Sequence, residues 1–266
     1  MKNFTVIIVC LFILSSCKTE FEKIRSSNDP ERIYNAANKY YENGDYMKAQ
    51  TMYELVIPFY RGKEEAETLF YNYAYTHYNT GQFILANHYF SSFGRTFYNS
   101  PLKEECEFMA AYSNVQLSPN HKLDQTYSQQ AIDELQQFAN RYPESERVQE
   151  CNELIDEIRL KLETKAFEQG ELYYNLGEYL SAITAFDNMI KDFPDTKRVD
   201  EVRFIVLKSC YEWAKKSVFS KREERFNETL KRFKQFKTKH ANSKYFDEAK
   251  EIEKITLKEL KIISNV

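Results

Sequence analysis

The fold class is decided by residues 170–194, which read GELYYNLGEYLSAITAFDNMIKDFP. Gly177 separates two segments with helical patterns of apolar residues, and Tyr179 and Ala182 follow it at short, fixed offsets. Glycine tolerates the positive φ with which many helices end, whereas Pro194 cannot continue a helix. The stretch therefore predicts a helix, a short turn and a second helix.

The same pattern recurs along the chain. Gly44-Asp45-Tyr46 and Gly81-Gln82-Phe83 repeat the glycine and the aromatic residue of the turn. A small residue follows at the expected crossing of the two helices in each copy; these residues are Ala49, Ala86, Ala131 (a half-copy), Ala182 and Thr229 (a degraded copy). Their spacings of 37, 45, 51 and 47 residues resemble tetratricopeptide repeats, whose unit is about 34 residues, with insertions after the second copy.

The expected fold is an all-α tetratricopeptide-repeat solenoid of about five helix-turn-helix units. One such unit cannot bury its apolar faces alone, so the five are expected to stack into one body. We expect a loop at residues 117–127, a connection at 217–222 and a capping helix over 246–263. Only 6 Gly and 6 Pro occur among 266 residues, which disfavours a turn-rich β fold. The alternative is a generic helical bundle, against which three copies with identical offsets argue.

The N-terminal residues have a different character. Phe4 to Leu14 form an apolar run that is too short to span a bilayer but suits the core of a signal peptide. Leu14-Ser15-Ser16-Cys17 resembles the lipobox of bacterial lipoproteins, in which the cysteine is acylated. The resemblance implies a signal peptide at 1–16, a lipidated linker at 17–28 and a repeat domain at 29–266, with the membrane reached through lipid on Cys17. The alternative is an ordinary secretory signal with a chance cysteine.

No residue pattern indicates catalysis or a cofactor. The histidines lack the spacing of metal ligands, and no phosphate-binding or nucleophile motif occurs. We expect Cys106, Cys151 and Cys210 to be buried as small apolar residues. The net charge of -3 gives no sign of nucleic-acid binding. The sequence therefore favours a binding protein over an enzyme.

Two segments carry a resemblance to a known family. Residues 131–145 read AIDELQQFANRYPES and residues 182–196 read AITAFDNMIKDFPDT. Their shared ending, together with the lipobox and five repeats, resembles the BamD family of outer-membrane assembly lipoproteins over about residues 17–263. The fifth repeat departs from this pattern, because it has Ala241-Asn242-Ser243 where the family has proline. The second repeat departs as well, with its proline displaced to Pro101.

The resemblance implies a lipoprotein of the outer membrane that faces the periplasm. Its partners would be a BamA-type barrel subunit, bound through the C-terminal repeats, and unfolded outer-membrane β-barrel proteins, bound through the N-terminal repeats. The alternative is another tetratricopeptide lipoprotein that coordinates cell-envelope or peptidoglycan proteins.

In tetratricopeptide solenoids the first helix of each unit lines the groove, which predicts the residues that would contact a peptide. They are Tyr34, Asn38, Tyr41, Tyr71, Tyr75, Tyr78, Asn79, Phe167, Tyr174 and Asn175. Tyrosine offers a large contact area with a polar tip, and asparagine can bond an extended backbone. Packing between neighbouring repeats is the alternative role for these tyrosines. Arg225 and Lys231 are predicted to contact an acidic partner, unless the helix that carries them is simply amphipathic.

Overall fold

The computed structural model describes residues 19–265, within which there are twelve helices and no strand. Cys17 and the predicted signal peptide lie outside the described residues. In the first half the helices are α2 (Glu20–Arg25), α3 (Pro30–Glu42), α4 (Tyr46–Tyr60), α5 (Ala66–Asn79), α6 (Phe83–Thr96) and α7 (Lys103–Leu117). They continue as α8 (Thr126–Arg141), α9 (Val148–Asn175), α10 (Tyr179–Asp192), α11 (Val199–Lys215), α12 (Phe219–Lys239) and α13 (Phe246–Ile263). Among the described residues, no helix has the length and apolarity needed to cross a membrane.

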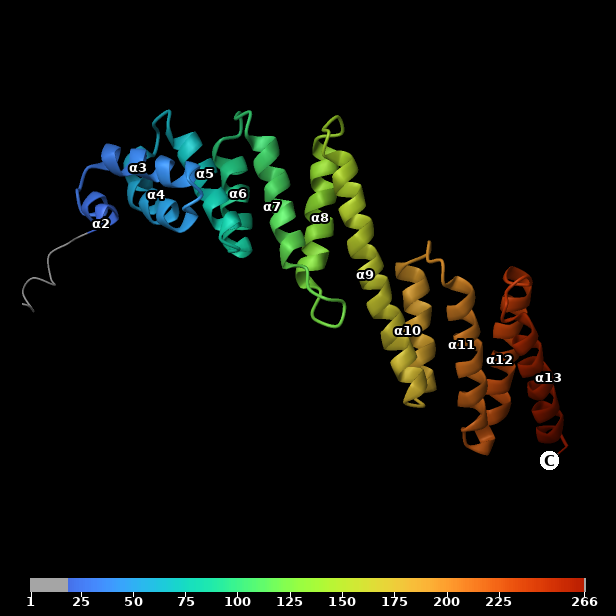
Figure 1. The fold of residues 1–266 in the computed structure, drawn as a ribbon. Helices are drawn as coiled ribbons and strands as arrows, with labels where there is room; N and C mark the ends of the chain where they lie inside the picture. Colours follow the sequence, from blue (N-terminus) through green and yellow to red (C-terminus); the bar gives the residue numbers. More distant parts are fainter. Residues whose placement is uncertain (1–18, 266) are drawn as a thin grey trace, which may run out of the picture. The chain divides into compact units, whose positions relative to one another are not determined.

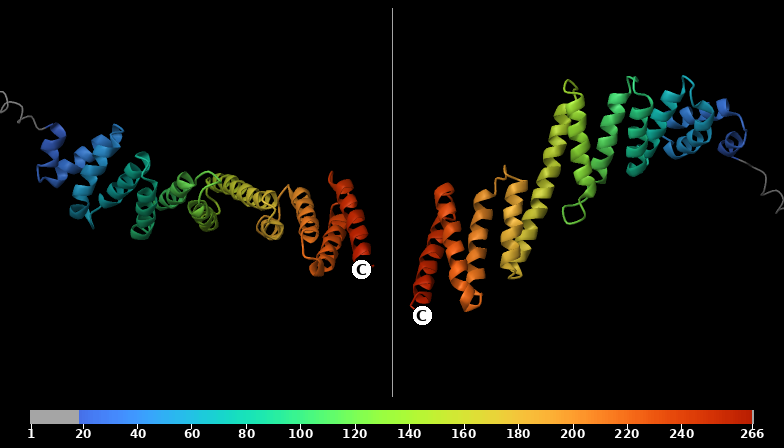
Figure 2. Two further views of the ribbon diagram at one scale, coloured as in Figure 1. Left: turned by 90° about the horizontal axis from the view of Figure 1, so that it is seen from below. Right: turned by 180° about the vertical axis from the view of Figure 1, so that it is seen from behind.

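The chain divides into two compact units. Unit 1 holds Met1–Pro119 and Gln125–Asp156, and unit 2 holds Asn120–Asp124 and Glu157–Val266. Within each unit, consecutive helices lie side by side and alternate in direction (Figures 1 and 2). The predicted helix-turn-helix repeats are confirmed, and the pairs α3/α4, α5/α6, α7/α8 and α11/α12 pack closely. The predicted capping helix over 246–263 is also confirmed, as α13.

The turn between the two helices of a repeat has the predicted chemistry. Gly44, Gly81 and Gly177 have φ values of +78°, +73° and +79°, a region that other residues seldom adopt. The aromatic residue two positions later packs edge-on against a tyrosine five residues before it. The three pairs are Tyr41–Tyr46, Tyr78–Phe83 and Tyr174–Tyr179, with ring centroids 5.7, 5.4 and 5.7 Å apart. This contact closes the turn in each of the three complete repeats.

Small residues allow the helices of a repeat to approach closely. The marker alanines of the second helices, Ala49, Ala86, Ala131 and Ala182, have no exposed surface. Gly170 is the extreme case, because a Cβ atom there would lie 2.7 Å from the ring of Phe186. The fourth repeat therefore needs glycine where the first two have Ala37 and Ala74.

The shared repeat ending also has a structural reason. Ser145 donates a hydrogen bond to Glu104 at 2.6 Å, and Thr196 donates one to Glu163 at 2.5 Å. In both cases the acceptor is a carboxylate on the first helix of the same repeat, and the same Ser or Thr oxygen accepts a backbone N–H at the start of the next helix. The hydroxyl thus fixes the loop at both ends. Ser100 bonds Glu67 in the same way, although its repeat has the displaced Pro101.

Two expected segments differ from the structure. The connection predicted at 217–222 is wrong, because α12 begins at Phe219 and only Lys216–Val218 separate it from α11. Arg222 bonds the carbonyl of Ser217 from within the first turn of α12, which secures the early start of the helix. Residues 20–25, expected to be linker, form the short helix α2, and Phe21 packs edge-on against Tyr40 at 5.8 Å.

Candidate protein-binding surfaces

The first helices of the repeats in unit 1 are joined by polar contacts as well as by packing. The hydroxyl of Tyr53, a buried residue of α4, donates to Oδ1 of Asn38 at 2.7 Å and accepts from Nδ2 of Asn72 at 3.2 Å. Asn38 belongs to α3 and Asn72 to α5, so one tyrosine connects three helices. Asn38 is half-buried and therefore has only part of its amide available to a ligand.

The tyrosines predicted on α3 are half-buried against their own unit. Tyr34 lies with its ring centroid 4.6 Å from that of Tyr60. Tyr41 contacts Tyr46 and Tyr53, and burial, together with the nearby phenols of Tyr71 and Tyr46, raises the pKa of Tyr41 to about 12. The Tyr41 side chain therefore stays neutral at physiological pH and presents an aromatic ring rather than a charge.

On α5, Tyr71 and Tyr75 form a pair with ring centroids 4.8 Å apart. Tyr71 also contacts Phe93, and Tyr75 contacts Phe90 edge-on at 4.9 Å, so the pair rests on the buried phenylalanines of α6. Burial is the main cause that raises the pKa of each of the two tyrosines. Both rings remain half-buried, which leaves part of each accessible.

Tyr78 extends the same row towards α7. Its ring lies 6.2 Å from that of Tyr112, which stacks on Phe108 at 5.6 Å. Asn79, at the end of α5, is exposed. We refer to the accessible row as the aromatic surface of unit 1; it consists of Tyr34, Asn38, Tyr41, Tyr71, Tyr75, Tyr78 and Tyr112.

Tyr112 was not predicted from the sequence. The prediction aligned the repeats by the small residues of their second helices. The long loop after α7 lengthens the third repeat, so its second helix does not follow that of the second repeat by 37 residues. The first helices keep that spacing, because Ala37, Ala74 and Ala111 are 37 residues apart and all fully buried. This register aligns Tyr112 with Tyr75 and would have identified it.

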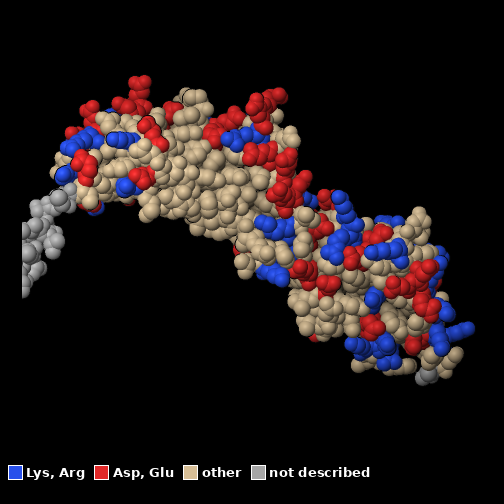
Figure 3. Space-filling view, in the orientation of Figure 1, with Lys and Arg blue, Asp and Glu red and all other residues tan. Residues whose placement is uncertain are grey.

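The aromatic surface belongs to a part of unit 1 that has very few charges. From Thr68 to Gly94 the chain contains no Asp, Glu, Lys or Arg, and none occurs from Phe108 to His121. Figure 3 shows a broad uncharged area over α5, α6 and α7, with acidic side chains gathered along one edge of the unit. Two large apolar residues of this part of the chain, Ile84 and Leu85, are exposed.

In unit 2 the predicted groove residues do not all reach the surface. Tyr174 is half-buried, with its ring 5.7 Å from that of Tyr179, and Asn175 is exposed. The prediction for Phe167 is wrong, because its side chain is 3% exposed within the core. The guanidinium of Arg198, from the loop after α10, covers the Phe167 ring at 3.2 Å.

The predicted partner residues Arg225 and Lys231 do not form one surface. Arg225 stacks on Trp213 at 4.0 Å and bonds the hydroxyl of Ser217, so its guanidinium is used within unit 2. Lys231 is exposed and pairs with Glu228 at 3.2 Å. Six residues apart on a helix, the two side chains point roughly 120° away from each other.

Between Thr19 and Asn265, no group of three or more His, Cys, Asp and Glu side chains is placed to hold a metal ion. The predicted burial of Cys106, Cys151 and Cys210 is confirmed. Burial raises the pKa of Cys151 to about 11 and that of Cys210 to about 12, so neither thiol is activated for nucleophilic attack.

Comparison with known proteins gives the chain a family. The family model of the outer membrane lipoprotein YfiO matches residues 26–209. The outer membrane protein assembly factor BamD of Pasteurella multocida (strain Pm70) is 20% identical over 226 residues, which cover 80% of this chain and 84% of that protein.

Two solved structures are similar in part. The TPR2AB-domain:pHSP90 complex of yeast Sti1 is 14% identical with a TM-score of 0.39, over 88% of this chain and 99% of that chain. The P58(IPK) TPR domain is 14% identical with a TM-score of 0.40, over 93% and 72%. The family is decided by the family model, whose match spans more than half of the sequence. The chain belongs to the YfiO family of outer membrane lipoproteins, in agreement with its resemblance to BamD.

Proposed function

We propose that this lipoprotein is a non-enzymatic scaffold of the machine that assembles β-barrel proteins in the outer membrane. In this proposal unit 1 holds unfolded barrel segments on its aromatic surface, and unit 2 contacts a BamA-type barrel subunit. The observation that carries the proposal is the row of half-buried tyrosines, of which Tyr71, Tyr75 and Tyr78 lie in the stretch from Thr68 to Gly94 that has no charged side chain.

The chemistry of the aromatic surface suits such a ligand. Strands of outer-membrane barrels alternate apolar and polar residues and carry aromatic residues near both membrane interfaces. An unfolded strand can place its apolar and aromatic side chains against tyrosine rings, while the phenol and amide groups bond its backbone. The low density of charge reduces the cost of desolvating ions when the segment covers this surface, and the nearby Glu105 is already paired with Arg147.

The proposed anchor is the lipid on Cys17. Several acyl chains, each contributing about 0.8 kcal/mol per buried CH₂, would hold the protein at the membrane. Attachment through Cys17 would leave the repeats on the periplasmic side, where unfolded barrel proteins are available before insertion.

Peptide binding tests the substrate part of the proposal. We expect a fluorescent peptide with the C-terminal sequence of a barrel protein to bind the intact protein. Affinity should fall at least tenfold when Tyr71→Ala and Tyr75→Ala are combined, since each ring offers about 1–2 kcal/mol of apolar contact. A matched control combines Tyr98→Ala with Tyr127→Ala, which removes two tyrosines of unit 1 outside the aromatic surface. Equal affinity for both double variants and the unaltered protein would refute this role.

Co-purification from outer membranes tests the partner part. Recovery of a BamA-type barrel subunit with the tagged protein is the expected result. Recovery of peptidoglycan enzymes without any barrel subunit would instead support the alternative of a cell-envelope coordinator.

A further inference from the structure

Two cavities occupy equivalent places in the repeats of the two units. Each lies between the second helix of one repeat and both helices of the next: α6, α7 and α8 in unit 1, and α10, α11 and α12 in unit 2. Their volumes are about 430 and 470 Å³. Phe138 lines the first cavity, and Phe236 lines the second at the same repeat position.

Their charges differ at three equivalent lining positions, at one of which Asp187 of the second cavity takes the place of Ser91 in the first. Glu107 and Glu134 of the first cavity are replaced by Arg203 and Arg232 in the second. The first cavity is lined by three basic and two acidic side chains, whereas the second has four basic side chains and one acidic one. We refer to the second as the basic cavity of unit 2; its charged side chains are Asp187, Lys191, Arg203, Arg232 and Lys239.

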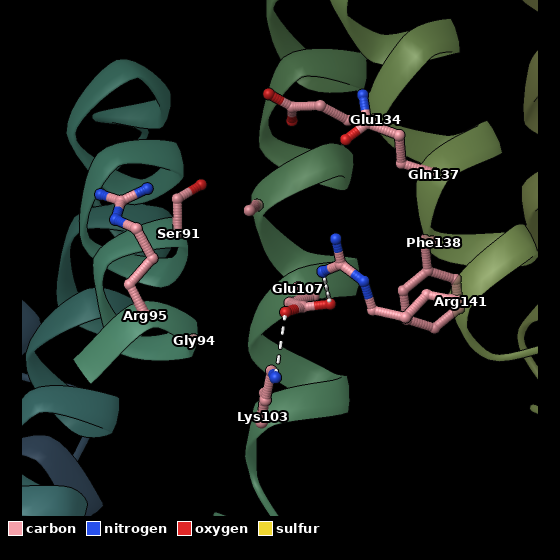
Figure 4. Close-up of a pocket in the computed structure, with 10 residues that line it drawn as sticks. Ser91, Gly94, Arg95, Lys103, Glu107, Glu134, Gln137, Phe138 and Arg141 are labelled. Carbon is pink, nitrogen blue, oxygen red and sulfur yellow. Dashed lines mark hydrogen bonds and ion pairs between the residues drawn. The ribbon is translucent and has the colours of Figure 1, made fainter. Parts of the chain in front are cut away.

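The first cavity has a smaller positive surplus, because two carboxylates lie among its three basic side chains (Figure 4). Glu107 accepts from Arg141 at 2.5 Å and lies 3.9 Å from Lys103. Glu134 is bonded by the amide of Asn87 at 3.0 Å, and burial raises the pKa of Glu134. Glu107 thus offsets part of the positive charge of Arg141 and Lys103.

The basic cavity keeps a positive surplus. The carboxylate of Asp187 is shared by Arg203 at 2.8 Å and Arg232 at 2.9 Å, so one negative charge faces two positive ones. Glu228 pairs with Arg232 at 2.9 Å and offsets part of the remaining positive charge. Lys191 and Lys239 are exposed and form no ion pair with any residue between Thr19 and Asn265.

His240 also lines the cavity and brings one further acidic group, Asp200, close to it. Nδ1 of His240 lies 2.6 Å from Asp200. An anion that entered the cavity would therefore meet two unpaired lysines beside guanidinium groups that Asp187 already holds in place.

From this geometry we infer that the basic cavity of unit 2 receives an acidic segment of a partner protein, with Lys191 and Lys239 contacting its carboxylates. A hollow between three helices admits a projecting loop, whereas a bilayer surface requires a flat or convex contact. Phe236 offers an apolar floor for the methylene groups of a glutamate. The inference concerns unit 2 alone and does not depend on substrate binding by the aromatic surface of unit 1.

The test uses the intact protein and a labelled peptide of about ten residues with alternating glutamate and serine. The expected result is saturable binding that weakens with salt and is lost when glutamine replaces glutamate. Combining Lys191→Gln with Lys239→Gln should weaken binding about fivefold to tenfold, as expected for two exposed ion pairs. The matched control combines Arg95→Gln with Arg141→Gln, which removes the same charge at the equivalent positions of unit 1 and should leave binding unchanged.

Three results would overturn the inference. One is equal weakening by both double variants, which would mean non-specific attraction. Another is equal binding of the glutamine peptide. In the third, the two lysine substitutions abolish binding to phosphatidylglycerol vesicles but leave binding to the acidic peptide unchanged. That result would assign the cavity to a lipid surface. Thermal unfolding of each variant checks that the fold is intact.

Discussion

The hydroxyl of Tyr75 donates a hydrogen bond to Oε1 of Glu105 across 2.6 Å. The other oxygen of this carboxylate pairs with Arg147 at 2.7 Å, immediately before α9. The half-buried carboxylate of Glu105 thus joins α5, α7 and the loop that follows α8. Burial and this hydrogen bond together raise the pKa of Tyr75, which keeps the donor protonated.

Removal of this hydroxyl should weaken unit 1 while leaving the ring in place. We expect Tyr75→Phe to lower the free energy of unfolding by about 1–3 kcal/mol, the range for a hydrogen bond to a charged acceptor. Tyr98→Phe is the control, since Tyr98 is 69% exposed. Urea denaturation measures both, and identical midpoints for the two variants would contradict the assigned contact.

Gly170 should not tolerate a methyl group. Its added Cβ would lie 2.7 Å from the Phe186 ring, so Gly170→Ala should destabilise unit 2 by about 1–3 kcal/mol through overpacking. Substituting Phe186→Leu in the same chain should recover part of this loss, although Phe186→Leu alone destabilises. A double-mutant cycle by denaturation gives the coupling, and a coupling near zero would refute the proposed clash.

His77 should make stability depend on acid pH. It is buried, its ring packs against Tyr73 and Tyr89, and burial lowers the pKa of His77 below its usual value near 6.5. The unfolded chain therefore binds a proton more readily than the folded one, and this contribution to stability is lost as the pH falls below about 6.5.

The measurement for His77 is the free energy of unfolding between about pH 7.5 and pH 5. His77→Gln should flatten the fall in stability across this interval. His88→Gln changes an exposed histidine and should retain the slope of the unaltered protein. A steeper fall in stability for His77→Gln would contradict the predicted direction of the pH dependence.

The three buried thiols should be unreactive in the folded protein. Cys106, Cys151 and Cys210 have no exposed surface, and burial raises the pKa of each. We expect iodoacetamide at about pH 8 to label them only after unfolding in urea, because the thiolate is the reactive form. Mass spectrometry reports each cysteine separately, and rapid labelling of any one in the folded protein would place it at the surface.

The repeats were predictable because each turn depends on local chemistry. Gly44, Gly81 and Gly177 need positive φ whatever surrounds them, and the aromatic residue two positions later contacts a tyrosine only five residues away. Such short-range requirements appear directly in the sequence as fixed offsets.

The sites were less predictable because they depend on distant residues. Phe167 has the same spacing as the half-buried tyrosines, but Arg198 from the loop after α10 covers its ring. Arg225 lies in a basic stretch of sequence and was expected to be available to a partner, but its guanidinium stacks on Trp213 of the neighbouring helix. The contrast between Glu107 and Arg203 becomes meaningful only when the two cavities are compared in space.

The uncharged stretch from Thr68 to Gly94 has a consequence for the protein before it folds. Charged residues normally interrupt apolar, aromatic-rich segments and keep nascent chains from aggregating. This stretch has no such gatekeeper, and four of its aromatic residues lie between Phe70 and Tyr75. A protein proposed to hold aggregation-prone chains thus contains such a segment itself, and it must fold its second repeat early or be shielded until it does.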